Sequence, residues 1–137
     1  MITTEVKIVA DFFSCDPMGV VWNGKYFDFF EIGRRELFRS VGLRYKTMSD
    51  EGFMLPLVRN KIKYIRPMRF EDEATLSLNV VEYEYLLRIK YEIRGMDGTL
   101  LTKGESEQMA TDLEGKAFSP LPESLRNALE KLGKEDV

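Results

Sequence analysis

A two-residue alternation of apolar and charged side chains constrains this fold more than any other feature of the sequence. In its clearest stretch, residues 87–94, four apolar residues alternate with four charged ones. A period of two places one strand face in a core and the other in water, which is typical of antiparallel sheets. The pattern also predicts strands over 74–80 and 101–112, with a hairpin turn at 95–98. Another predicted strand, which Pro67 closes, carries Val58, Ile62 and Tyr64 on one face.

The first half of the chain predicts one further strand and one long helix. The alternating apolar positions of the strand are Val6, Ile8, Ala10 and Phe12. Asn23 is a favoured helix N-cap residue, no proline interrupts residues 24–41, and Gly42 supplies a natural helix end.

The predicted helix over 24–41 carries apolar residues on most sides of its first turns. Its apolar residues are Tyr26, Phe27, Phe29, Phe30, Ile32, Leu37, Phe38 and Val41. Such a helix belongs in the centre of a molecule rather than on its surface. Gly33 costs about 1 kcal/mol relative to alanine in a helix interior, which indicates close approach by a strand or by a second subunit.

These elements combine into one α+β domain over residues 1–137, in which a curved antiparallel sheet wraps around the long central helix. A short terminal helix follows the segment Ser119-Pro120-Leu121-Pro122 and carries Leu125, Leu129 and Leu132 on one face. With 137 residues, 44% of them hydrophobic, the chain buries one core of ordinary size and has no room for a second domain.

The sequence contains no histidine, which excludes Ser-His-Asp and Cys-His catalysis and histidine-ligated zinc. The single cysteine, Cys15, excludes an internal disulfide and a cysteine-only zinc site. We therefore expect no metal site and no cofactor. A formal charge of −3 provides no global basic field for nucleic acid, and no segment is apolar enough for a signal peptide or a membrane span. We expect a cytoplasmic location, no nucleic-acid partner and no membrane span.

The segment from Asp16 to Asn23 places a carboxylate immediately before the long helix. The first turn of a helix offers unpaired N–H groups that stabilise an oxyanion developing on a substrate carbonyl. Asp16 would then attack that carbonyl or activate a water to do so. On the residues alone, the alternative is that Asp16 caps or braces the turn. Cys15 has no imidazole to deprotonate it and fits a buried small hydrophobe better than a nucleophile.

This segment resembles the signature of hotdog-fold acyl-CoA thioesterases of the 4-hydroxybenzoyl-CoA thioesterase type. After their first strand, those enzymes carry Asp-x-x-Gly, two aliphatic residues, an aromatic residue, then a tyrosine and, one turn later, an acidic residue. The matching residues here are Asp16, Gly19, Val20, Val21, Trp22, Tyr26 and Glu31. Tyr64-Ile65-Arg66-Pro67 and Phe70-Glu71-Asp72 also match, and the resemblance covers residues 4–130. It implies a hotdog fold.

By this resemblance, Asp16 is the catalytic carboxylate, acting as nucleophile or general base, and the backbone N–H of Asn23 polarises the thioester carbonyl. Many relatives carry His or Tyr at the position of Asn23, so the resemblance assigns no task to its side chain. It also implies a homodimer or homotetramer with the acyl pocket at a subunit interface. The many aromatic residues of the helix predicted over 24–41 are what such an interface would need.

Further residues are candidates for substrate contact: Gly19, Trp22, Tyr26, Glu31, Arg59, Lys61 and Lys63. The alternative for Trp22 and Tyr26 is a place in the core, and for Glu31 an ion pair on the helix. The basic strand face with Arg59, Lys61 and Lys63 suits the phosphates of coenzyme A, or simply solvent. Arg88 and Lys90 are the other phosphate candidates, because the basic hairpin residues of aryl-CoA relatives are replaced here by Tyr83-Glu84-Tyr85-Leu86.

The sequence therefore predicts a thioester hydrolase that acts on an acyl-CoA or on an acyl carrier protein thioester. The alternative is a non-catalytic homo-oligomeric module that binds acyl-CoA or acyl carrier protein. Hotdog hydratases and dehydratases use a histidine, so the composition disfavours them. The acyl group stays open, because Met18, Phe53, Met54 and Met68 suit aromatic and aliphatic tails equally.

Overall fold

The computed structural model describes residues 2–135, so residues 1 and 136–137 of the expected domain lie outside it. In chain order the elements are β1 (Ile2–Val9), a 3-10 helix (Phe12–Ser14), α1 (Lys25–Ser40), α2 (Tyr45–Asp50), β2 (Phe53–Met54), β3 (Leu57–Tyr64), β4 (Glu73–Glu82), β5 (Leu87–Gly95), β6 (Leu100–Gln108), β7 (Ala110–Asp112), β8 (Ala117–Phe118) and α3 (Glu123–Glu135). The long strands and the helices α1 and α3 lie where the sequence predicts them, with the corrections below, although α3, with 13 residues, is longer than the short helix expected there. The elements α2, β2 and β8 are additions that the patterns do not predict.

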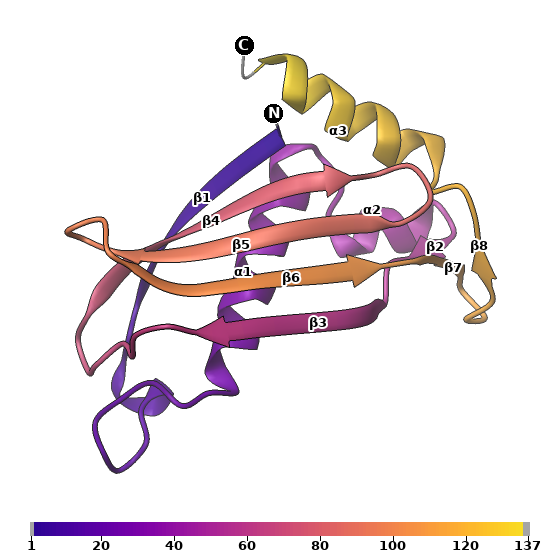
Figure 1. Cartoon of the computed structure of the whole chain (residues 1–137). Coiled ribbons are helices and arrows are strands. Elements are labelled where there is room, and N and C mark those ends of the chain that lie inside the picture. The colour runs from indigo at the N-terminus through magenta and orange to yellow at the C-terminus, as the bar shows by residue number, and fades with distance from the viewer. Residues whose placement is uncertain (1, 136–137) are drawn as a thin grey trace.

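Five strands form one antiparallel sheet in the order β1-β4-β5-β6-β3. Figure 1 shows α1 lying along one face of this curved sheet, with α3 beside the end where the N-terminus lies. The predicted α+β class, with a curved antiparallel sheet around a long central helix, is confirmed. No helix within residues 2–135 is long and apolar enough to cross a membrane.

The core lies between α1 and the inner face of the sheet. Its strand residues include Leu76 and Leu78 of β4 and the alternating apolar residues of β5, all of them buried. A Cβ atom on Gly33 would lie 2.5 Å from Leu78 Cδ1 and 2.8 Å from Leu76 Cδ2. Contact with β4, rather than with a second subunit, therefore accounts for this glycine.

Two predictions about the first half of the chain are wrong. Phe12 does not continue strand β1 but lies 72% exposed in the 3-10 helix, where Asp11 Oδ1 accepts a hydrogen bond from the Ser14 N–H at 2.9 Å. Asn23 is not the N-cap of α1, because that position falls on Gly24 and no side chain caps the helix. Ile32, expected to widen the apolar face of α1, is exposed.

Two further corrections concern the second half of the sheet. The register between β3 and β6 shifts at Val58, and this irregularity leaves Val58 half-exposed instead of facing the core with Ile62. The predicted strand over 101–112 divides at Met109, after which β7 joins a separate sheet of order β2-β7-β8. The Met109 N–H donates to Pro56 O at 3.2 Å, so the segment before β3 draws the chain out of the large sheet.

Candidate active site

Asp16 lies in a short hairpin that leads from the 3-10 helix into α1. The Trp22 N–H donates to Ser14 O at 2.8 Å, and the Asp16 N–H donates to Val20 O at 2.8 Å. Gly19 closes the turn with φ of +79°, a conformation that favours glycine, and its N–H donates to Asp16 O at 3.0 Å. The hairpin thus places Asp16 just ahead of the N-terminal end of α1.

The hairpin is tied to the connection between β3 and β4. The Val21 N–H donates to Met68 O at 2.8 Å, and the Phe70 N–H donates to Gly19 O at 3.0 Å. In Figure 1 this part of the chain forms the loop that projects at the lower end of the molecule. Backbone bonds on both sides of the turn therefore hold Asp16 in place without help from its own side chain.

The two carboxylate oxygens of the half-buried Asp16 are in different situations. Oδ1 accepts a hydrogen bond from the Met18 N–H at 2.8 Å and lies 3.4 Å from the Val20 nitrogen. Among residues 2–135, no hydrogen-bond donor reaches Oδ2. Asp16 Oδ1 therefore braces the turn, as the structural alternative predicts, and Oδ2 has no partner among the described residues that would prevent it from reacting.

The peptide at Asn23 has a fixed position and a free donor. The Tyr64 hydroxyl donates to Asn23 O at 2.8 Å, whereas the Asn23 N–H has no acceptor among the residues from 2 to 135. A Cβ atom on Gly24 would lie 2.3 Å from the Trp22 ring, so the glycine lets the indole lie against the start of α1. Because Trp22 is 62% exposed, the core alternative does not hold for it.

Tyr26 and Cys15 occupy structural positions near this hairpin. Tyr26 is 2% exposed, its hydroxyl accepts a hydrogen bond from the Met68 N–H at 3.3 Å, and its ring packs against Tyr64. The core alternative therefore describes Tyr26. Burial, followed by the nearby carboxylates of Asp11 and Asp16, raises the pKa of the half-buried Cys15 thiol. A raised pKa disfavours the thiolate that a nucleophile needs.

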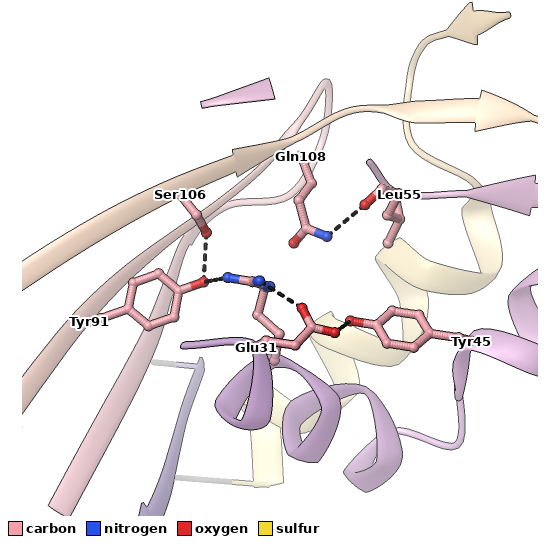
Figure 2. Close-up of polar contacts among 7 residues, drawn as sticks. Glu31, Tyr45, Leu55, Tyr91, Ser106 and Gln108 are labelled. Carbon is pink, nitrogen blue, oxygen red and sulfur yellow. Dashed lines mark hydrogen bonds and ion pairs between the residues drawn. The ribbon is translucent and has the colours of Figure 1, made fainter. Parts of the chain in front are cut away.

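Glu31 belongs to a polar network that the sequence analysis missed (Figure 2). Its Oε2 accepts a hydrogen bond from Arg34 Nη2 at 2.7 Å, and its Oε1 accepts one from the Tyr45 hydroxyl at 3.0 Å. Arg34 Nη1 donates to the Tyr91 hydroxyl at 3.0 Å, which lies 2.6 Å from Ser106 Oγ. The ion-pair alternative for Glu31 is thus present in the structure.

Arg34 is a guanidinium inside an apolar core, since only 2% of the residue is exposed. Its Nε and Gln108 Oε1 are buried without a hydrogen-bond partner within residues 2–135, and the Gln108 Nε2 donates to Leu55 O at 2.8 Å (Figure 2). Burial acts to lower the pKa of Arg34, but Tyr91 and Glu31 outweigh it and raise that pKa. The signal in the sequence was a charged residue at the helical spacing of Phe30 and Phe38.

The basic residues of β3 lie on the outer face of the sheet, turned away from α1. Arg59 and Lys61 approach Glu107 and Glu105 at 4.0 Å and 3.9 Å. Lys63 is instead directly opposite Lys103 of β6. A cavity of about 370 Å³ on this face is lined by Lys61, Ile62, Lys63, Lys90, Lys103, Gly104 and Glu105. Of the predicted phosphate candidates, Lys61, Lys63 and Lys90 line this cavity, and Arg59 does not. Lys103, which the sequence did not single out, also lines it.

Residues 12–129 match the family model described as the thioesterase-like superfamily. The chain belongs to this family. It is 26% identical over 122 residues to the putative acyl-CoA thioesterase YneP of Bacillus subtilis (strain 168), an alignment that covers 88% of this chain and 87% of the relative. It is also 29% identical over 131 residues to the putative esterase sll0410 of Synechocystis, covering 93% of this chain and 79% of that protein.

Solved structures share the fold. A DHNA-CoA thioesterase from Staphylococcus aureus superposes with a TM-score of 0.87 at 24% identity, covering 99% of this chain and 94% of that one. SAV2348 of Staphylococcus aureus, solved in complex with CoA, gives a TM-score of 0.87 at 20% identity, covering 98% and 87%. The predicted hotdog fold and the assignment to the thioester hydrolases are confirmed. The roles of individual site residues stay predictions.

Proposed function

We propose that this member of the thioesterase-like superfamily hydrolyses an acyl-CoA or an acyl carrier protein thioester, with Asp16 as nucleophile or general base. The observation that supports this proposal is a half-buried carboxylate with one unengaged oxygen, followed seven residues later by an unengaged Asn23 N–H just ahead of α1.

The chemistry requires one of two sequences of steps. As a base, Asp16 takes a proton from a water whose oxygen attacks the thioester carbon; as a nucleophile, it attacks that carbon itself and forms an anhydride that water then hydrolyses. In both, the developing oxyanion accepts a hydrogen bond from the Asn23 N–H, and the C–S bond breaks to release a thiolate, which becomes the free thiol by taking up a proton that the attacking water has lost. Gly19 shapes the turn, and the exposed Trp22 ring offers a wall for the thioester arm.

Coenzyme A is the preferred carrier in this proposal, because a structural relative was solved in complex with CoA. Lys61, Lys63, Lys90 and Lys103 surround a cavity that contains one acidic residue, Glu105, which suits phosphate groups. An acyl carrier protein, being acidic, would use the same basic surface.

We further propose a homodimer or homotetramer in a cytoplasmic setting. Phe12, Phe13, Met18 and Trp22 are more than 60% exposed around the Asp16 hairpin, an apolar surface that isolated soluble monomers rarely present. A second copy that covered these side chains would enclose the acyl group next to Asp16. The expected interface pocket therefore adjoins the proposed catalytic carboxylate.

The decisive experiment measures thiol release from a panel of acyl-CoA esters by the wild type and by Asp16→Asn. The substitution keeps the shape and removes the charge, so turnover should fall by about a hundredfold or more, the scale for losing a positioned base. Asp28→Asn is the matched control, because it removes an exposed carboxylate from the first turn of α1 and leaves the hairpin intact.

Near wild-type turnover by Asp16→Asn would show that the proposed mechanism is wrong. A wild type that binds acyl-CoA but releases no thiol from any ester would instead support the non-catalytic binding module.

A further inference from the structure

A second basic cavity lies at the opposite end of α1 from Asp16. It has a volume of about 250 Å³ and is lined by Arg35, Phe38, Arg39, Arg44 and Tyr45, from the last turns of α1 and the start of α2. At 1.5 Å per residue the 16 residues of α1 span about 24 Å, so this cavity is remote from the Asp16 hairpin. The proposed hydrolysis makes no use of it.

The charge around this cavity is positive, in a chain whose formal charge is −3. Arg39 is offset by Glu36, to which its Nε donates at 2.9 Å. For Arg35 and Arg44, no carboxylate lies within 4.0 Å in the part of the chain that the structure describes. The partial negative charge at a helix C-terminus accounts for Arg39, in the last turn, but not for Arg35 or for Arg44, which lies beyond α1.

Two aromatic rings line the same cavity. Phe38 is buried and Tyr45 is 40% exposed, with ring centroids 5.8 Å apart in an edge-to-face arrangement. The Tyr45 hydroxyl donates to Glu31 Oε1 at 3.0 Å, which restrains the ring at the exposed end of the network in Figure 2. The cavity therefore has a restrained aromatic wall beside two guanidinium groups that lack a counter-charge.

We propose that this cavity binds the phosphorylated end of a nucleotide, with Arg35 and Arg44 on the phosphate and Tyr45 against the base. A guanidinium matches the geometry of phosphate oxygens and pairs with them in a bidentate manner, and an exposed aromatic ring stacks with a base. Whole-ligand pockets usually measure about 300–1,000 Å³, so a cavity of this size takes a head group. This inference goes beyond the proposed function, because it requires no chemistry at Asp16.

Binding of adenosine 3′,5′-bisphosphate, measured by isothermal titration calorimetry, tests the site. The wild type should bind it saturably, and the double substitution Arg35→Gln with Arg44→Gln should weaken binding by about tenfold or more, the scale for losing a charge-assisted hydrogen bond. Arg66→Gln with Arg69→Gln, two exposed arginines in the connection between β3 and β4, is the matched loss of two charges and should leave this binding unchanged. Asp16→Asn should also bind normally, so the result is independent of the proposed hydrolysis.

The Michaelis constant for acyl-CoA distinguishes two sources of the nucleotide. If the variant with Arg35→Gln and Arg44→Gln raises it, the cavity holds the nucleotide end of the substrate; if the constant is unchanged while bisphosphate binding is lost, the ligand is a separate nucleotide. The proposal is overturned if the wild type does not bind the bisphosphate, or if the variant with Arg35→Gln and Arg44→Gln binds it as tightly as the wild type. Circular dichroism spectra that match the wild type ensure that lost binding reflects the site and not the fold.

Discussion

At the scale of single residues, the partners of the Glu31–Arg34 ion pair differ in burial, and this difference predicts an asymmetry in stability. Arg34 is 2% exposed, whereas the Glu31 side chain is 41% exposed. Removing one partner of an ion pair is costly when the remaining charge is buried. Glu31→Gln leaves the buried guanidinium without a counter-charge and should cost about 3 kcal/mol in the free energy of unfolding.

In Arg34→Met, the charge that remains is the Glu31 carboxylate, which water reaches, and the methionine side chain fills the space of the arginine stem in the core. We expect this substitution to cost less than about 1.5 kcal/mol, whereas Arg34→Ala, which opens a cavity, should cost about 2–5 kcal/mol. Urea unfolding of the three variants measures these values. A smaller loss for Glu31→Gln than for Arg34→Met would contradict the reasoning.

Tyr45 predicts a pH dependence of stability. Burial, followed by the charge of Glu31, raises the pKa of Tyr45 from 10.0 to about 12. The unfolded chain therefore loses this proton near pH 10 and the folded chain only near pH 12, so the contribution to stability is complete below pH 10 and is lost as the pH rises towards 12. Tyr45→Phe should flatten the fall in the free energy of unfolding across this window, as measured by urea titrations at successive pH values. Tyr85→Phe, at an exposed position, should keep the wild-type slope, and equal slopes for all three proteins would refute the assignment.

At the scale of elements, the pairing of β3 with β6 brings Lys63 opposite Lys103 in the lysine-lined cavity, and we expect this cavity to contribute to the affinity for acyl-CoA. Lys63→Gln with Lys103→Gln should raise the Michaelis constant for acyl-CoA and leave the turnover number nearly unchanged, because the ground state and the transition state lose the same phosphate contact. The effect should shrink with added salt. A truncated thioester without the nucleotide is the control and should show no change. Loss of turnover with both substrates would assign these lysines to the fold or the acyl pocket instead.

At the scale of the whole molecule, the sheet ends on a strand whose outer edge has no partner strand within residues 2–135. Strand β3 pairs with β6 on one side and forms the edge of the five-stranded sheet on the other, where Leu57, Val58, Tyr64 and Ile65 are exposed. An exposed edge with apolar side chains is suited to pairing with another chain. We therefore expect a dimer or tetramer in sedimentation velocity at micromolar concentration. A single species of 15.9 kDa would exclude the interface pocket.

Local patterns determined the long strands, the long helix and the turn at Asp16, because the two-residue period of β4 and β5 and the Pro17-to-Gly19 turn act over a few neighbouring residues. The same patterns, together with the resemblance they carried, identified the family. Only the tertiary structure decided that Arg34 is buried against Tyr91, that Lys63 faces Lys103, and that Val58 leaves the core face at a register shift. These outcomes depend on how segments roughly forty or more residues apart align with one another, and the side-chain period of a single strand does not encode its register against a distant partner.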